Sequence, residues 1–304
     1  TLAAARRWFG ERIRLIPVGS SGTADLDWLA ARLGDSQPAM VMLMAANNET
    51  GVLQPWRDAA ALCQKHGVPF ACDAAQWIGR LPAAGLGTCG FVTGSAHKFG
   101  GPPGVGFMKV APGFLPLLVG GPQEAGRRAG TENVPGILAM AAAWAEREGQ
   151  IAAGGASVRQ TWRDAFIGAL HARIPGVTIL GVEAPRLWNT VAALMPATAD
   201  CRRRWVVQLD KLGFAVSTGS ACASGKEQPS HVLMAMKAGA AGSDRMLRFS
   251  AGWETSQDDW RELEAAAEAA FRSVRRSPSG SRAGQPAASN RRPRMARISR
   301  PMAR

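Results

Sequence analysis

Short apolar runs alternate with amphipathic stretches through the first part of the chain. The apolar runs lie at 13–18, 39–46, 68–72, 91–94 and 105–110, and the helical patterns lie near 2–10, 25–33 and 56–66. Pro55 precedes the third helical pattern and Gly67 follows it, as is usual where a helix starts and stops. This alternation predicts a parallel or mixed sheet covered by helices.

The second part of the chain predicts a smaller mixture of helices and strands. A helical pattern over 134–174 is interrupted at 152–157, where the sequence is A-A-G-G-A-S. Later runs predict short strands at V-T-I-L, N-T-V-A-A-L-M, F-A-V-S-T and R-M-L-R-F-S. Ser256 is a good N-cap for a last helix, because acidic residues follow it in the first turn. We therefore predict an α/β fold with a large domain at 1–150 and a smaller α+β domain at 151–274.

The composition is that of a globular protein, with 46% hydrophobic and 19% charged residues. The longest apolar stretch, 137–145, falls well short of the ~20 residues that span a membrane, so we expect no membrane span. The net charge of +13 is concentrated at the end of the chain: nine arginines and no acidic residue lie at 275–304. This segment has few apolar residues and predicts a disordered tail, and its lack of aromatic residues does not favour a nucleic-acid partner.

The cysteines favour neither a metal site nor a disulfide framework. There are five, an odd number, and no two are spaced as C-x-x-C. A reducing, cytoplasmic setting follows as the default expectation. We interpret Cys63 and Cys72 as buried residues that act as small hydrophobes.

Polar residues follow several predicted strands at the point where each strand ends. Asn48, Asp73 and the segment 95–98 all lie at such ends, where ligands gather in α/β folds. Lys98 follows Asp73 by 25 positions. Pyridoxal 5'-phosphate requires such a pair, because an amine forms a Schiff base with its aldehyde and a carboxylate keeps its ring nitrogen protonated. A surface lysine after a strand is the alternative, and the neighbouring motifs must decide between the two.

Six motifs occur in order along the chain: A-N-N-E-T-G-V at 46–52, D-A-A-Q at 73–76, S-A-H-K at 95–98, R-R-A-G-T at 127–131, S-T-G-S-A-C-A-S-G at 217–225 and R-F-S at 248–250. This series resembles the class V aminotransferase family, and specifically its cysteine desulfurases of the NifS/IscS type. The resemblance covers nearly all of residues 1–270. It implies the aspartate aminotransferase-like fold of pyridoxal-phosphate-dependent transferases, with a mixed sheet in the large domain.

The resemblance also implies a role for each matching residue. The catalytic residues that it implies are Lys98, His97 and Cys222. The cofactor-binding residues are Asn48, Asp73, Gln76, Ser95, His97, Lys98 and Thr131. Asn48 and Arg248 would bind the substrate, and no metal is expected. Thr131 would reach across a dimer interface to the partner's phosphate, so the resemblance implies a homodimer.

Cys222 specifies the reaction. Small residues surround it, which is typical of a mobile loop that could present a thiol to substrate and acceptor. The resemblance then implies conversion of L-cysteine to L-alanine, with a persulfide left on Cys222. It also implies transfer of that sulfur to an acceptor protein such as an iron–sulfur scaffold, or to a tRNA-thiolation acceptor.

Two alternatives stay open. The chain could be another class V enzyme, such as a selenocysteine lyase or an aminotransferase. It could also be a non-catalytic fragment or scaffold, because the family carries an earlier segment with a phosphate-binding cup and a stacking histidine for which we find no counterpart here. We therefore expect that the chain lacks its N-terminal part. Ala125 and Trp253 also stand where the family commonly has arginine.

Overall fold

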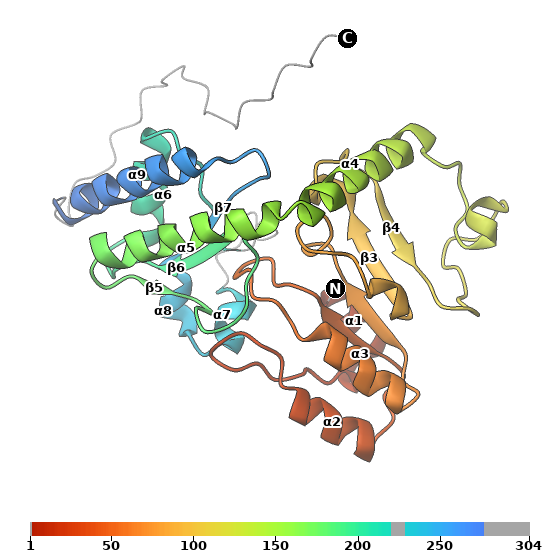
Figure 1. Ribbon diagram of the computed structural model, residues 1–304. Helices are drawn as coiled ribbons and strands as arrows, with labels where there is room; N and C mark the ends of the chain where they lie inside the picture. Colours follow the sequence, from red (N-terminus) through yellow and green to blue (C-terminus); the bar gives the residue numbers. More distant parts are fainter. Residues whose placement is uncertain (1, 220–228, 277–304) are drawn as a thin grey trace, which may run out of the picture.

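Two separate sheets, joined by two consecutive long helices, organise the fold (Figure 1). The structure is a computed structural model that describes residues 2–219 and 229–276. The joining helices are α4 (Val134–Ala152) and α5 (Gly155–Arg173). Gly154 lies between them with φ +81°, so the interruption predicted at 152–157 is confirmed.

The first sheet has four strands in the order β1-β2-β3-β4. Their bounds are Val41–Met44, Phe70–Asp73, Phe91–Ser95 and Gly106–Lys109. The first three strands are parallel and β4 is antiparallel to β3, so the predicted mixed sheet is confirmed. The register pairs Met44 with Asp73 and Asp73 with Thr93, so three strands end together at one edge.

The helices of this first part are α1 (Leu2–Phe9), α2 (Leu26–Asp35) and α3 (Trp56–Lys65), with short 3₁₀ turns η1 (Gly10–Arg12), η2 (Leu86–Thr88), η3 (Ala96–Lys98) and η4 (Gln123–Gly126). Helix α3 begins directly after Pro55, and Gly67 has φ +66° just beyond its end, as predicted. Cys63 on α3 and Cys72 on β2 are buried in the same core cluster, and both are at most 1% exposed. This burial confirms their interpretation as buried hydrophobes, and it raises the pKa of Cys63 to about 11 and that of Cys72 to about 12.

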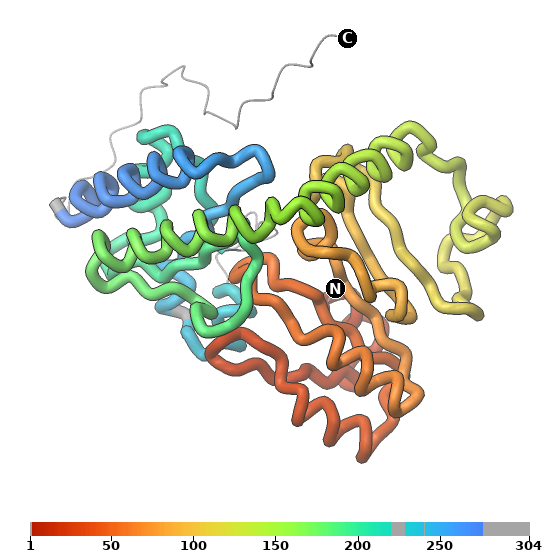
Figure 2. The backbone as a smooth tube through the Cα atoms, viewed as in Figure 1, coloured from red at the N-terminus to blue at the C-terminus, as the bar shows by residue number. Residues whose placement is uncertain are grey.

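The second sheet is antiparallel, in the order β5-β6-β7. Its strands are Thr178–Ile179, Thr190–Leu194 and Met246–Ser250, and the accompanying helices are α6 (Cys201–Lys211), α7 (His231–Ala235), α8 (Gly239–Ser243) and α9 (Gln257–Arg276). Helix α9 starts as predicted, because the Ser256 hydroxyl accepts a hydrogen bond from the Asp259 N–H at 3.2 Å. The backbone trace shows the two sheets in separate lobes that are connected where α4 passes into α5 (Figure 2).

Two predicted strands are wrong. Residues 13–18 form only an isolated bridge between Val18 and Ala24, because Pro17 has no N–H and no described strand lies alongside. The run F-A-V-S-T contributes one bridge, Ser217 to Arg248, before the chain turns away at Gly219, where φ is +116°.

The limits of the second lobe differ from the prediction at the end of the chain. Helix α9 continues to Arg276, so the first two residues of the predicted 275–304 tail are helical. The rest of that tail and Cys222 lie outside the described residues. The proposed domain division after residue 150 falls inside the last turn of α4. Among the described helices, none has both the length and the apolar character needed to cross a membrane.

Candidate active site

Three strand ends form the centre of the candidate site. The Ala45 N–H donates to the Asp73 carbonyl at 2.8 Å, and the Ala74 N–H donates to the Thr93 carbonyl at 3.0 Å. These bonds continue the ladder past the ends of β1 and β2, so Asp73 is held at the same edge as Ser95, the last residue of β3. The edge is therefore lined by residues from three of the six sequence motifs.

Lys98 lies on a short turn, η3, directly after β3. Its side chain is exposed, as is that of His97, whereas the flanking Ala96 and Phe99 are buried. The Ala96 carbonyl accepts hydrogen bonds from the N–H groups of Phe99, at 3.0 Å, and Gly101, at 2.9 Å. The turn thus presents an exposed amine on a hydrogen-bonded backbone.

Asp73 offers a carboxylate at the same edge. It is half-buried, and its Oδ1 accepts a hydrogen bond from the Ala75 N–H at 3.1 Å. Gln76 follows on the same turn and is also half-buried; its carbonyl accepts from Arg80 Nη1 at 2.9 Å. Burial lowers the pKa of Arg80 to about 10.

The turn after β1 holds Asn48 at an exposed corner. The buried Asn47 side chain fixes this turn, because its Oδ1 accepts from the N–H groups of Glu49, at 2.8 Å, and Thr50, at 3.0 Å. Gly51 completes it with φ +75°, and a Cβ there would lie 2.8 Å from Thr190 Cβ. The motif A-N-N-E-T-G-V therefore encodes a rigid turn packed against the second lobe.

Arg248 on β7 reaches this turn from the second lobe. Its Nη1 donates to the Asn48 carbonyl at 2.9 Å. The structure thus brings together the two predicted substrate-binding residues, which are 200 positions apart in the sequence. Burial lowers the pKa of Arg248, and the nearby Glu49 carboxylate acts in the opposite direction. Arg248 Nε is buried and has no hydrogen-bond partner among the described residues.

Glu49 is a site residue that the sequence analysis did not single out. It is only 1% exposed, and its Oε2 accepts from the Ser230 hydroxyl at 2.5 Å. Its Oε1 is buried without a partner in the described part of the chain. Ser230 also caps α7 by accepting from the Leu233 N–H at 3.3 Å. The signal in the sequence was the acid within the motif at 46–52, but burial of that acid cannot be read from the sequence.

Two predicted site residues are not placed at the strand ends. Thr131 is exposed in the loop that precedes α4 and makes no hydrogen bond to a described residue. Cys222 lies outside the described residues, so its role stays a prediction. The assignments of Ser95 and His97 to a phosphate group likewise stay predictions.

The groups at the strand ends suit pyridoxal 5'-phosphate. The edge presents an exposed amine from Lys98 and a half-buried carboxylate from Asp73, with an amide, a hydroxyl and an imidazole from Gln76, Ser95 and His97. These match the cofactor's aldehyde, ring nitrogen, phenolic oxygen and phosphate. Within the described ranges, no group of three or more His, Cys, Asp or Glu residues is arranged to hold a metal ion.

Known proteins match this chain in sequence and in structure. A cysteine desulfurase of Cereibacter sphaeroides is 39% identical over 261 residues, which cover 84% of this chain and 65% of that protein. A cysteine desulfurase of Klebsiella pneumoniae is 40% identical over 244 residues, which cover 79% of this chain and 60% of that protein. The structure of a NifS-like protein from Rickettsia africae ESF-5 matches with a TM-score of 0.78 and 28% identity, over 88% of this chain and 72% of that chain.

These matches confirm the predicted α/β fold, which is that of NifS-like proteins. The chain spans about 60–65% of the length of these two curated relatives. The family model for aminotransferase class-V matches residues 1–263, the greater part of the sequence. The chain therefore belongs to the class V aminotransferase family.

Proposed function

We propose that the protein is a pyridoxal-phosphate-dependent cysteine desulfurase, which converts L-cysteine to L-alanine and leaves the sulfur as a persulfide on Cys222. The contact between Arg248 and Asn48, at 2.9 Å, carries this proposal. It brings a guanidinium to the edge that also presents Lys98 and Asp73, so an amino acid could be held by its carboxylate while its amine reaches the cofactor. The two similar proteins described above, both cysteine desulfurases, support the choice of cysteine as the substrate.

The cofactor, when bound, supplies an aldehyde for the substrate amine and a ring that withdraws electrons from the α-carbon. Lys98 would hold the cofactor through its amine, and that amine would then be placed to move a proton at the substrate α-carbon. Asp73 would keep the ring nitrogen protonated, because a carboxylate favours the charged form of a neighbouring base. Gln76 and Asn48 would donate to the phenolic oxygen and the nearby substrate, while Ser95 and His97 would bind the phosphate.

Arg248 orients the substrate. Its Nη1 is engaged by the Asn48 carbonyl, so the guanidinium has a defined plane in which to meet a carboxylate with two parallel hydrogen bonds. The Glu49 carboxylate stabilises the positive charge of the half-buried Arg248 guanidinium. A lysine at position 248 would lack the planar fork, and we expect it to bind the substrate less well.

Cys222 acts on the substrate sulfur as a thiolate. Its sulfur would form a bond to the substrate Sγ, the Cβ–Sγ bond would break with its electron pair left on the carbon side, and Cβ would take up a proton to give alanine. The described residues that flank this segment support the assignment. Ser217 pairs through its backbone with Arg248, and Ser230 bonds to Glu49, so both flanks are anchored beside the substrate arginine.

The further parts of the proposal concern partners. A homodimer, in which Thr131 reaches the phosphate of the partner's site, would complete the cofactor site. The persulfide would pass to an acceptor protein such as an iron–sulfur scaffold in the cytoplasm.

Formation of alanine from cysteine by the full-length protein tests the proposal. We expect Cys222→Ala to abolish the reaction and Cys63→Ala, the matched control at a buried thiol, to retain it. Turnover of cysteine that survives Cys222→Ala would favour a selenocysteine lyase or an aminotransferase. A full-length protein that neither binds pyridoxal phosphate nor produces alanine would favour a non-catalytic scaffold.

A further inference from the structure

Arg147 joins the turn that carries Lys98 to the loop that follows the Arg248 strand. It belongs to α4, and it is only 8% exposed. Buried arginines are rare in proteins unless they are paired, so its position calls for a physical explanation. Its partners supply one.

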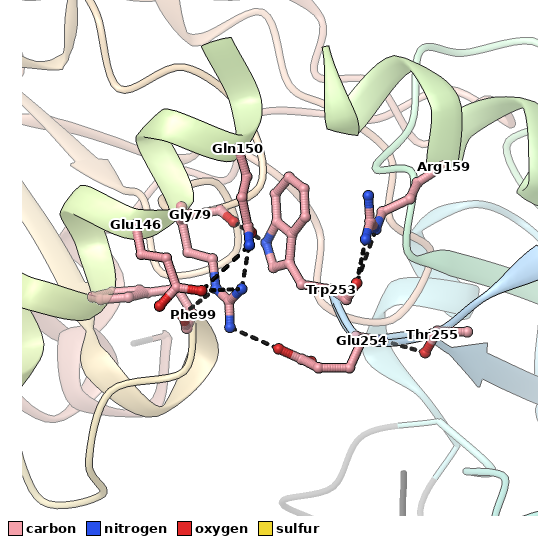
Figure 3. Close-up of polar contacts among 10 residues, drawn as sticks. Gly79, Phe99, Glu146, Gln150, Arg159, Trp253, Glu254 and Thr255 are labelled. Carbon is pink, nitrogen blue, oxygen red and sulfur yellow. Dashed lines mark hydrogen bonds and ion pairs between the residues drawn. The ribbon is translucent and has the colours of Figure 1, made fainter. Parts of the chain in front are cut away.

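The three guanidinium nitrogens of Arg147 point to three different elements. Nε donates to the Phe99 carbonyl at 3.1 Å, and Nη2 pairs with Glu254 Oε1 at 2.8 Å. Nη1 donates to Gln150 Oε1 at 2.9 Å, within α4 itself. One side chain thereby links the first lobe, the joining helix and the second lobe. Its partners Phe99, Gln150 and Glu254 are labelled in Figure 3.

The Phe99 contact bears directly on Lys98, because the two residues are adjacent in the chain. Phe99 is 2% exposed, and its ring packs against Trp144 with 6.2 Å between the centroids. Gly100 follows with φ +98°, and a Cβ there would lie 2.9 Å from Arg147 Nη2. The backbone after Lys98 is therefore enclosed between a buried ring and the Arg147 guanidinium.

The Glu254 contact fixes the loop that begins three residues beyond Arg248, directly after β7. Within this loop, Trp253 donates from Nε1 to the Gly79 carbonyl at 2.6 Å, and its own carbonyl accepts from Arg159 Nε at 3.2 Å. The Trp253 ring also meets the Trp188 ring edge-on at 4.8 Å. The loop is thus attached to both lobes, and Arg147 is its direct link to the Lys98 turn.

We propose that Arg147 is a positioning residue that sets the placement of Lys98 relative to Arg248. The inference rests on the proposed function, since it assigns the cofactor amine to Lys98 and the substrate carboxylate to Arg248. An arginine is required at this position because its planar fork can address the Phe99 carbonyl and the Glu254 carboxylate at once. A lysine offers one ammonium group, which cannot occupy both positions.

Arg159 provides a matched control. It bonds to the Trp253 carbonyl in the same loop, but it does not contact Phe99 or Glu254 through a hydrogen bond. A residue that only holds the lobes together would behave like Arg159. A residue that positions Lys98 would differ from it.

The first test measures hydrogen exchange in the full-length protein without added cofactor. The probes are the N–H groups of Phe99 and Gly101, which bond to the Ala96 carbonyl. We expect Arg147→Lys to accelerate their exchange about tenfold, because it removes a charge-assisted hydrogen bond from the turn. Arg159→Lys should leave both rates within about twofold. Equal effects of the two variants would overturn the inference.

The second test uses the protein loaded with pyridoxal phosphate and L-cysteine. We expect Arg147→Lys to lower kcat about 100-fold, with KM changed less than threefold, because a small displacement of the amine costs rate more than binding. The pH at which the absorbance of the Lys98-bound cofactor titrates should also shift, and Arg159→Lys should move neither property. A change in KM alone, with kcat unchanged, would contradict a positioning role.

Glu254→Gln serves as the second variant if Arg147→Lys does not fold. It retains the bond to Phe99 and weakens only the link to the Arg248 loop, so we expect kcat to fall about tenfold while the exchange rates at Phe99 and Gly101 stay the same. An unchanged kcat in this variant would also overturn the inference. Borohydride trapping separates the two proposals. A wild-type protein that is not labelled at Lys98 would contradict the proposed function. The hydrogen-exchange result tests the link between Arg147 and the Lys98 turn and does not depend on the cofactor.

Discussion

Replacement of Glu49 by glutamine should destabilise the protein measurably, although it exchanges only one non-hydrogen atom. Glu49 Oε2 accepts from the Ser230 hydroxyl at 2.5 Å, and the carboxylate lies near the half-buried Arg248. Exchanging a charge-assisted hydrogen bond for a neutral one costs about 1 kcal/mol. Loss of the charge opposite Arg248 costs about 1 kcal/mol more, a value well below that of a fully buried pair because Arg248 is partly exposed to water.

The expected total is therefore about 2 kcal/mol of unfolding free energy, or roughly 4–8 °C in Tm for a chain of this size. Denaturant unfolding of the wild type, Glu49→Gln and the exposed control Glu262→Gln would measure it, and the control should change stability by less than about 0.5 kcal/mol. A double-mutant cycle with Ser230→Ala should give a coupling energy of about 1 kcal/mol, separate from the loss of the α7 cap. A Glu49→Gln variant as stable as wild type, with no coupling to position 230, would refute this reasoning.

Three further predictions concern the backbone, a thiol and a helix end. Gly51→Ala should lower the unfolding free energy by about 2 kcal/mol, because φ is +75° and the new Cβ would meet Thr190. Gly67→Ala, the control, has open space around it and should lower the unfolding free energy by only about 1 kcal/mol. Chemical denaturation measures both, and equal losses would argue against the contact with Thr190. Burial raises the pKa of Cys63 from 9.0 to about 11, so the thiol loses its proton at a lower pH in the unfolded chain than in the folded one. Stability should therefore fall as pH rises from 9 to 11, and Cys63→Ala should make this fall less steep. An unchanged slope in the variant would contradict burial of the thiol. Ser256→Ala should lower stability by about 1 kcal/mol through loss of the α9 cap, and an unaltered Tm would contradict that geometry.

The sheet and its strand ends could be predicted because local sequence determines them. The apolar runs that became β1–β4 are each bounded by turn residues, and Asp73 and Ser95 end their strands as expected. The failures at 13–18 and 214–218 have one cause: a strand needs a neighbour to pair with, and pairing between distant segments leaves no local signal. A single bridge to Arg248 is all that residues 214–218 obtain.

The candidate site could be predicted where motif residues carry the chemistry themselves. Lys98, Asp73 and Arg248 are the motif residues to which the proposed chemistry is assigned, and the structure places them at or beside one edge of the first sheet. Glu49 and Arg147 could not be predicted as site residues, because their importance depends on burial and on partners that belong to other elements. A charged residue in a sequence is most often exposed, so only the fold shows that these two are enclosed.

Covalent labelling tests the central claim most directly. The full-length protein is incubated with pyridoxal phosphate, reduced with borohydride and digested, and the modified peptide is identified by mass spectrometry. The account predicts one pyridoxyl group on Lys98 and none in the Lys98→Ala variant, with Lys109, the nearest lysine after it in the chain, unmodified in both. A label on a different lysine, or no label on the full-length protein, would contradict it.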